Sequence, residues 1–125
     1  MQGGQEWICE VQGCTFETLA GSQGLEILKA LFLDLIEHLD LHPVGEPLWH
    51  VFGGPGGVTG LVALSESHLA CHSYPEAGYL SLNLYTCRER NAPDWQQVFE
   101  AHLGPCTVDV RRVRRGPRLL SETEA

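Results

Sequence analysis

Polar side chains that could perform catalysis are concentrated in the middle of the chain, around Ser67. A histidine follows directly at His68, and another lies four positions later at His72. If the residues after Ser67 form a strand, both imidazoles lie on one face, because alternate side chains of a strand share a face. A hydroxyl, two imidazoles and the thiol of Cys87 would then lie within plausible reach of one another.

These residues alone leave three interpretations open. They could be ordinary polar residues of a sheet. His68, His72 and Cys87 could bind zinc, because imidazole and thiolate are good zinc ligands, although their spacing matches no standard zinc pattern. Ser67 and a neighbouring histidine could instead form a nucleophile–base pair. The G-x-S-x-G motif of the α/β-hydrolases is absent from this segment.

The elements around these residues are predicted to be mostly strands. Two segments favour helix, 22–42 with apolar residues at steps of three and four, and 93–103. Ser22 is expected to cap the first helix and Pro43 to end it. The predicted strands are 7–13, 47–52, 58–64, 68–74, 79–87 and 107–115. Short turns between strands predict an α+β fold, a two-layer α/β sandwich with a largely antiparallel sheet and two helices packed on one face.

Size and charge limit the classes of partner. The 125 residues fit one domain, 1–125, and the formal net charge of −8 argues against nucleic acid, whose phosphates need a positive field. The basic run 111–115 is expected to be a charged edge strand. We expect no membrane partner, because no stretch is long and apolar enough to cross a bilayer. The first residues lack the features of a secretory signal, which predicts a cytoplasmic protein.

A string of motifs runs through this central region. It contains G-V-T-G from Gly57, then E-S-H, a histidine four positions later, P-E, G-Y, and a strand that ends in T-C at Cys87. The combined string resembles the signature of the prokaryotic S-adenosylmethionine decarboxylases over about residues 52–87. The resemblance implies a pyruvoyl-dependent decarboxylase that converts S-adenosylmethionine to the aminopropyl donor for spermidine and other polyamines.

The resemblance further implies a proenzyme that cuts itself between Glu66 and Ser67. The products would be a β chain of residues 1–66 and an α chain of residues 67–125, which begins with a pyruvoyl group derived from Ser67. The carbonyl of this group would form a Schiff base with the substrate amine, the role that pyridoxal phosphate has in other decarboxylases. No metal is expected.

The resemblance also assigns roles to individual side chains. His72 matches a histidine that transfers a proton during processing, and Thr59 matches a hydroxyl residue that holds the processing intermediate. Cys87 matches the cysteine that reprotonates the substrate carbon after decarboxylation. The expected substrate-binding residues are Glu76, Phe52 and Tyr74. The family works as a homodimer with sites near the interface, so a homodimer of processed protomers is expected here.

The chain departs from the family pattern around the expected substrate pocket. The loop after Phe52 carries one residue more than is usual. Tyr74 stands where tryptophan is usual, Asn83 where aspartate is usual, and Arg88 where a glycine follows the cysteine. Two alternatives therefore stay open: a pyruvoyl-dependent decarboxylase of ornithine or arginine on the same fold, and a non-catalytic relative that only binds a partner or small molecule.

Overall fold

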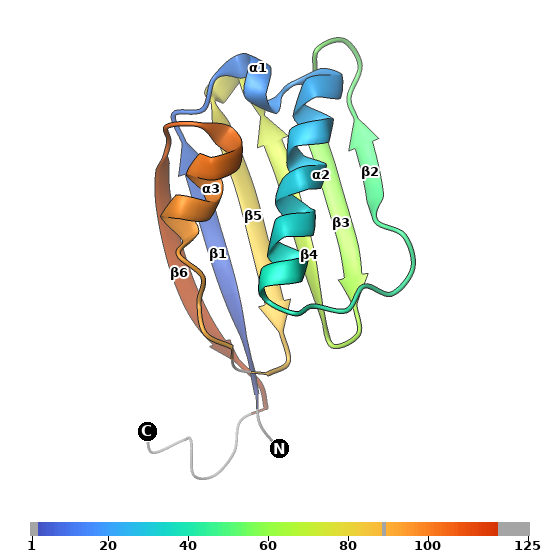
Figure 1. Cartoon of the computed structure of the whole chain (residues 1–125), viewed down its shortest axis with the longest axis vertical. Helices are drawn as coiled ribbons and strands as arrows, with labels where there is room; N and C mark the ends of the chain where they lie inside the picture. The colour runs from blue at the N-terminus through green and yellow to red at the C-terminus, as the bar shows by residue number, and fades with distance from the viewer. Residues whose placement is uncertain (1–2, 89, 118–125) are drawn as a thin grey trace.

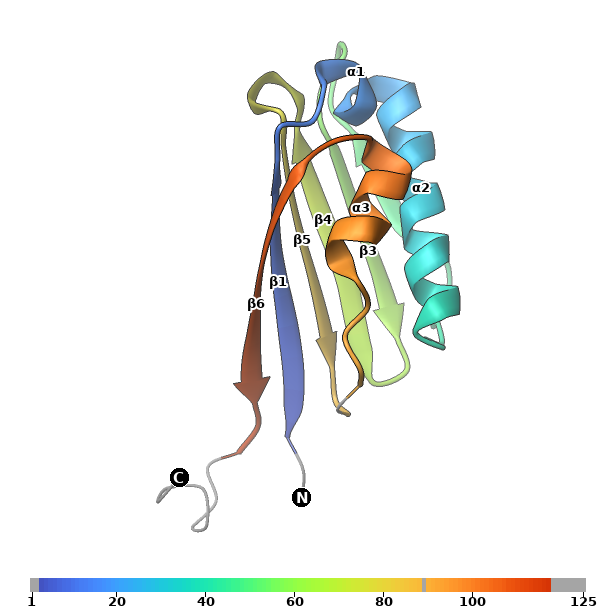
Figure 2. The same ribbon diagram turned by 60° about the vertical axis from the view of Figure 1, so that its left-hand side comes forward.

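The computed structural model describes residues 3–88 and 90–117. These residues form two layers, a six-stranded sheet and a set of helices that lie over one of its faces (Figure 1 and Figure 2). The strands are β1 (Gly4–Gln12), β2 (Leu48–Val51), β3 (Val58–Leu64), β4 (Ser67–Tyr74), β5 (Tyr79–Thr86) and β6 (Thr107–Arg115). The helices are α1 (Phe16–Leu19), α2 (Gly21–His38) and α3 (Trp95–Leu103), with a 3-10 turn η1 (Pro75–Ala77) between β4 and β5.

The strand order in the sheet is β2-β3-β4-β5-β1-β6. All neighbouring strands of the described sheet are antiparallel, and β3, β4 and β5 follow one another as hairpins. The predicted two-layer α+β sandwich is therefore confirmed. The prediction of two helices missed α1, because a helix of four residues is too short to show a periodic pattern.

The helices cover one face of the sheet and leave the other without a helix (Figure 2). On the covered face, alternate side chains of the strands are buried, among them Trp7, Val62 and Leu69. They pack with Phe32 of α2 and Phe99 of α3 in one core. We call the opposite side of the sheet the open face. Burial of one face and exposure of the other explains the alternating pattern along the strands.

The ends of α2 differ from the prediction. Its N-cap is Ala20, which forms no side-chain capping bond, so Ser22 is not the cap. The chain turns directly from α1 into α2 there, and Ser22 already lies inside the helix. The helix ends at His38, well before Pro43, because Asp40 adopts a positive φ of 54° that an α-helix cannot continue through. No helix among the described residues has the length and apolar character needed to cross a membrane.

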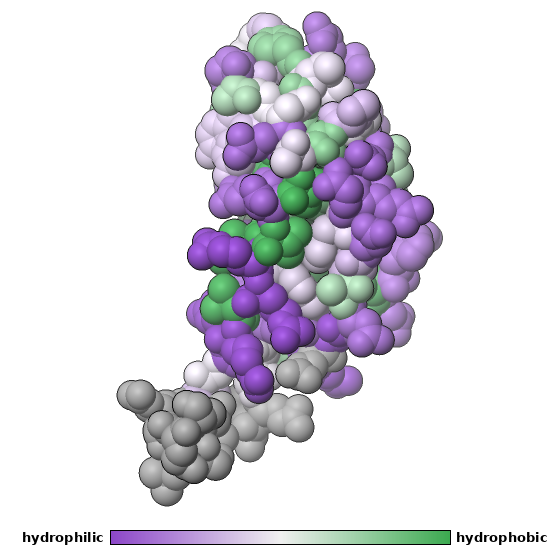
Figure 3. Space-filling view, turned by 90° about the vertical axis from the view of Figure 1, so that its left-hand side faces the viewer, coloured by the Kyte–Doolittle hydropathy of each residue, from purple (hydrophilic) through white to green (hydrophobic). Residues whose placement is uncertain are grey.

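The basic run 111–115 lies in β6, which is an edge strand as predicted. Seen from this edge, hydrophilic side chains surround a small hydrophobic area (Figure 3). Arginine side chains on an edge strand oppose pairing with the strand of another chain, because that pairing would bring like charges together.

Asp34 joins α2 to α3 and makes a testable contribution to stability. Its carboxylate lies 2.7 Å from Nε2 of His102 and 2.6 Å from Nδ1 of His38. The hydrogen bond with His102 is the main cause of the lowered pKa of Asp34, and hydrogen bonds to Asp34 raise the pKa of His38. A lowered carboxyl pKa stabilises the fold above the ordinary 3.8, and a raised imidazole pKa stabilises it below the ordinary 6.5. The contribution of these ionic contacts to the free energy of unfolding is therefore largest between pH 3.8 and pH 6.5.

We expect Asp34→Asn to lower the free energy of unfolding by about 0.5 kcal/mol near pH 5.5, the size of a partly exposed ion pair. The difference from the native chain should be smaller near about pH 8, because the contribution of His38 is lost as pH rises through its raised pKa. Thermal unfolding of both chains at the two pH values measures this. An equal difference at both would contradict the ionic linkage.

Candidate active site

Five of the predicted site residues lie at the end of the sheet where β4 leads into η1. We call them the His72 group: Phe52, Thr59, His72, Tyr74 and Glu76. Thr59 and His72 lie directly opposite each other on β3 and β4, with Oγ1 of Thr59 3.1 Å from Nδ1 of His72. Tyr74 stacks on Tyr79 with ring centroids 5.4 Å apart. A hydroxyl, an imidazole and aromatic rings therefore meet at this end.

The other three predicted residues lie at the opposite end, and we call them the Ser67 group: Glu66, Ser67 and Cys87. The β3–β4 turn consists of two residues, because Leu64 pairs with Ser67. Cys87 follows β5, and its main-chain N–H donates to the carbonyl oxygen of Glu66 at 3.2 Å. The carbonyl that the Ser67 hydroxyl would have to attack is thus already held by a hydrogen bond.

The two groups are far apart within one chain. Ser67 and His72 are five residues apart on the same strand, which spans about 16 Å at the usual rise. The β3–β4 turn and η1 accordingly lie at opposite ends of the sheet (Figure 1). The expectation that the hydroxyl, both imidazoles and the thiol lie within reach of one another in one chain is therefore wrong, because β4 is extended along its whole length.

The faces of β4 follow the predicted alternation. Leu69 and Cys71 are buried on the covered face, whereas His68 and His72 share the open face. Ser67 has the parity of Leu69, so its side chain belongs to the covered side.

The zinc interpretation is not supported by these positions. His68 and His72 are four residues apart along an extended strand, which is about 13 Å. Among residues 3–88 and 90–117, no group of three or more His, Cys, Asp or Glu side chains could hold a metal ion.

Cys87 differs from the chain's other cysteines in its exposure. It is exposed, whereas Cys9, Cys14 and Cys71 are buried. Burial is the main cause that raises the pKa of Cys9 and Cys71 to about 12 and that of Cys14 to about 11. These three remain protonated in the core. The thiol at 87 is the one that lies in the Ser67 group.

Arg88 is a contact of the site that sequence reasoning missed. Its Nε lies 2.8 Å from one carboxylate oxygen of Glu66, and its Nη2 donates to the other at 2.9 Å. The pairing of Ser67 with Thr86 brings the turn beside the residues that follow β5. Only this register places residues 66 and 88 together, and no local pattern in the sequence reveals it.

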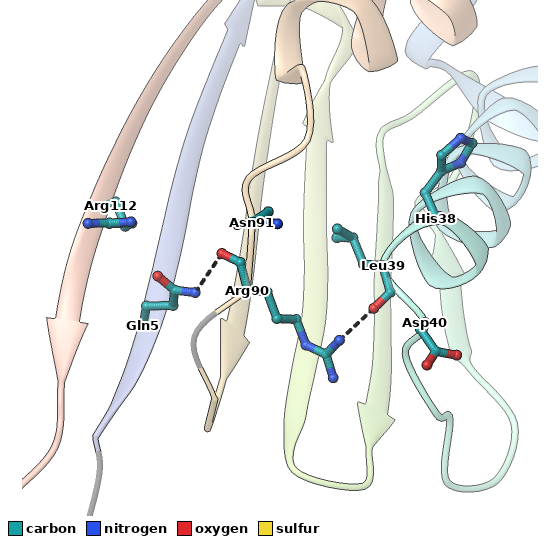
Figure 4. Close-up of a pocket in the computed structure, with 7 residues that line it drawn as sticks. All are labelled: Gln5, His38, Leu39, Asp40, Arg90, Asn91 and Arg112. Atoms are coloured by element: carbon teal, nitrogen blue, oxygen red, sulfur yellow. Dashed lines mark hydrogen bonds between the residues drawn. The ribbon is translucent and has the colours of Figure 1, made fainter.

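A second arginine, Arg90, holds the segment after β5 in place. Its Nη1 donates to the main-chain oxygen of Leu39 at 2.7 Å, and Gln5 donates to the main-chain oxygen of Arg90 at 3.1 Å (Figure 4). These bonds border a hollow of about 620 Å³ that contains none of the predicted site residues. A smaller hollow of about 190 Å³ borders the Glu66–Ser67 peptide.

The sequence analysis also did not predict two carboxylates on the open face, those of Glu6 and Glu10. Glu10 accepts a hydrogen bond from the Tyr79 hydroxyl, and this bond is the main cause that raises the pKa of Tyr79 to about 12. Glu6 accepts a hydrogen bond of 2.8 Å from Nδ2 of Asn83. Asn83, which stands where aspartate was expected, is therefore part of a polar network that includes β1.

Comparison with known proteins shows the family to which this chain belongs. The fold matches the crystal structure of the adenosylmethionine decarboxylase from Aquifex aeolicus VF5, with a TM-score of 0.74 over 95% of each chain at 20% identity, a likeness of fold alone. The family model of S-adenosylmethionine decarboxylase matches residues 5–116. The chain therefore belongs to the S-adenosylmethionine decarboxylase family, and the resemblance inferred from the central motifs is confirmed.

Individual relatives agree with this membership. The S-adenosylmethionine decarboxylase proenzyme of Methanococcus maripaludis strain C7 is 34% identical over 116 residues, which cover 92% of this chain and 91% of the relative. The proenzyme of Geobacillus sp. strain WCH70 is 32% identical and covers 98% of this chain and 94% of the relative. That of Moorella thermoacetica is 39% identical over 92 residues, which cover 72% of this chain and 68% of the relative.

Proposed function

We propose that this chain is a single-domain, pyruvoyl-dependent decarboxylase of S-adenosylmethionine that supplies the aminopropyl donor for polyamine synthesis. The observation that carries the proposal is the Glu66–Ser67 peptide, which lies at a two-residue turn with its carbonyl held by the N–H of Cys87. This peptide occurs in a chain whose relatives are named proenzymes. Five free cysteines agree with a reducing, cytoplasmic location.

The residues at this turn fit a pyruvoyl group made from the chain itself. The Ser67 hydroxyl attacks the Glu66 carbonyl carbon, the peptide C–N bond breaks, and an ester replaces the amide while the hydroxyl proton passes to the freed amine. Removal of the Ser67 Cα proton then expels the Glu66 carboxylate. The dehydroalanine that remains takes up water and releases ammonia. The cut yields chains 1–66 and 67–125.

The chain's own groups divide the work between processing and turnover. His72 removes the Cα proton, and Thr59, which lies 3.1 Å from His72, orients the imidazole and donates to the intermediate. A pyruvoyl carbonyl supplies an electron sink for decarboxylation. Cys87 donates a proton to the substrate carbon after carbon dioxide leaves. Phe52, Tyr74 and Glu76 bind the substrate, and the carboxylates of the open face favour a cationic one.

The separation of the two groups supports a homodimer. The open face exposes large apolar side chains that a monomer would leave in water: Leu48 is 68% exposed, Phe52 52%, Tyr74 46% and Leu61 42%. An exposed apolar surface of this kind is typical of an interface. We propose that two copies pack open face to open face, each with its strands reversed relative to the other.

A two-fold axis then completes the site. In an isologous two-fold contact, if residue i of one chain contacts residue j of its partner, then residue j of the first chain contacts residue i of the partner. With the strands reversed, the Ser67 group of one chain lies against the His72 group of its partner. Each dimer would contain two complete sites, and each site would combine Ser67 and Cys87 with the partner's His72 and Thr59.

Cys87 separates processing from turnover in a testable way. We expect Cys87→Ser to cut itself, because only the main-chain N–H of residue 87 contacts the Glu66 carbonyl. Decarboxylation should fall about 100-fold, the usual effect of removing a general acid. Gel analysis measures the cut and carbon dioxide release measures the turnover. Cys14→Ser, which changes a buried thiol, is a control for general effects of the substitution on folding. Full turnover in Cys87→Ser would contradict the assigned role.

The substrate is tested by direct comparison. Purified protein is given carboxyl-labelled S-adenosylmethionine, ornithine or arginine, and released carbon dioxide is counted. Release from S-adenosylmethionine supports the proposal. Release from a basic amino acid alone would favour the second decarboxylase, for which the changes at Tyr74 and Asn83 are the motivating observation. No release from any of them by a chain that stays uncut would favour a non-catalytic relative.

A further inference from the structure

We propose that Arg88 is a positioning residue for self-cleavage, which holds Glu66 while the bond to Ser67 is cut. This inference rests on the proposed function above, because it concerns the same peptide. Two consecutive residues after β5 contact Glu66. The N–H of Cys87 donates a hydrogen bond to its carbonyl oxygen, and the guanidinium of Arg88 donates to its carboxylate. We call this pair of contacts the Glu66 clamp.

The geometry of the clamp is specific to arginine. Nε and Nη2 of Arg88 engage the two carboxylate oxygens separately, at 2.8 and 2.9 Å. This planar, two-point contact restrains the orientation of the carboxylate more than a single ammonium could. Lysine could preserve the charge, but it could not reproduce the forked contact.

Other basic groups near the turn have different partners. Arg90 also borders the hollow beside the Glu66–Ser67 peptide, but its Nη1 is bound to Leu39 at the end of α2 (Figure 4). His42 lines the same hollow, and its Nε2 lies 3.9 Å from Asp40. Among the described residues, Arg88 is the basic side chain in contact with Glu66.

The clamp acts on the residue whose bonds change during cleavage. The attack of Ser67 requires the Glu66 carbonyl to keep its direction, and a side chain held at its far end restricts rotation of the residue within the two-residue turn. Elimination then leaves a carboxylate on the main chain of Glu66. The guanidinium supplies a positive charge beside this second negative charge. Both effects predict faster cutting with Arg88 present.

The test follows the cut in freshly made chain, because purified protein would already be processed. Labelled chain is made by cell-free translation, synthesis is stopped, and the uncut fraction is measured against time. We expect Arg88→Ala to cut about fivefold more slowly, since the pair is exposed to solvent at 71% for Arg88 and 42% for Glu66. Arg88→Lys should be intermediate. Lys29→Ala removes an exposed cation paired with Glu26 on α2 and should cut at the native rate.

A double-substitution cycle separates positioning from a structural role. Glu66→Gln should also slow the cut, and Arg88→Ala should slow the Glu66→Gln chain less than it slows the native chain. High salt should slow the native chain toward the Arg88→Ala rate and leave that variant unchanged. Thermal unfolding of uncut Ser67→Ala chains, with and without Arg88→Ala, measures any loss of stability.

The outcomes distinguish this inference from the function on which it rests. Coupled, salt-dependent slowing supports the clamp. Native-rate cutting by Arg88→Ala, or independent effects of the two substitutions, would overturn the clamp and leave self-cleavage intact. A native chain that never cuts would overturn both.

Discussion

Ser67→Ala will leave one intact chain of residues 1–125, whereas the native chain will be recovered as two fragments. Alanine has no hydroxyl to attack the Glu66 carbonyl, so neither the ester nor the elimination that follows it can form. The effect should be complete on the time scale of a preparation, because peptide bonds are otherwise stable in water. Decarboxylation should be lost with the cut. Denaturing gels and intact mass measure the first effect, and carbon dioxide release measures the second.

The same turn supplies a matched control. Ser65 is exposed, and its main-chain N–H donates to the oxygen of His42 at 2.9 Å, a bond that does not involve its hydroxyl. Ser65→Ala should therefore be cut as the native chain is. If Ser67→Ala were cut between residues 66 and 67, the proposed nucleophile would be wrong. If Ser65→Ala alone stayed uncut, the hydroxyl would come from the neighbouring serine.

His72→Ala and Ser67→Ala will each stay uncut when made alone, yet the His72→Ala chain will be cut when the two are made together. In a mixed dimer, the intact Ser67 of one chain faces the partner's His72, so one of the two sites is complete. Removing a proton-transfer residue costs about 100-fold or more. Random pairing gives mixed dimers in roughly half of all cases, so roughly half of the His72→Ala chains should be cut.

Two different affinity tags, one on each variant, allow the cut chain and the mixed dimers to be identified. The tag on the His72→Ala chain identifies which chain is cut, and the tag on the Ser67→Ala chain recovers the mixed dimers. Thr59→Ala with Ser67→Ala provides a second pair, because Thr59 lies beside His72 at the same end of the sheet. Mixed dimers that contain no cut chain would refute a site shared between copies, as would efficient cutting of His72→Ala made alone.

Local sequence patterns predicted the fold and the faces of its strands. The bounds of β3 and β6 were those predicted, and the period of two placed His68 and His72 on one face. The glycines of G-V-T-G also have packing roles that the motif alone does not reveal. A Cβ at Gly60 would overlap the Trp49 ring, and one at Gly57 would overlap the main-chain oxygen of Ser73.

The assembly of the site could not be predicted from the same patterns. A motif is continuous in the sequence, but an extended strand carries its two ends apart, so Ser67 and His72 separate although they are five residues apart. The contact of Glu66 with Arg88 depends on the register of β4 with β5, which a local pattern does not contain. Long-range pairing and the packing of a second copy decide which groups meet.

The central claim is that this chain makes its own prosthetic group at Ser67, and intact mass of the purified native protein tests it most directly. We predict two fragments, 1–66 and 67–125. The second should be lighter than a fragment beginning with serine by the mass of one ammonia, because conversion of serine to pyruvoyl releases it. A single uncut chain that still decarboxylates S-adenosylmethionine would contradict the account.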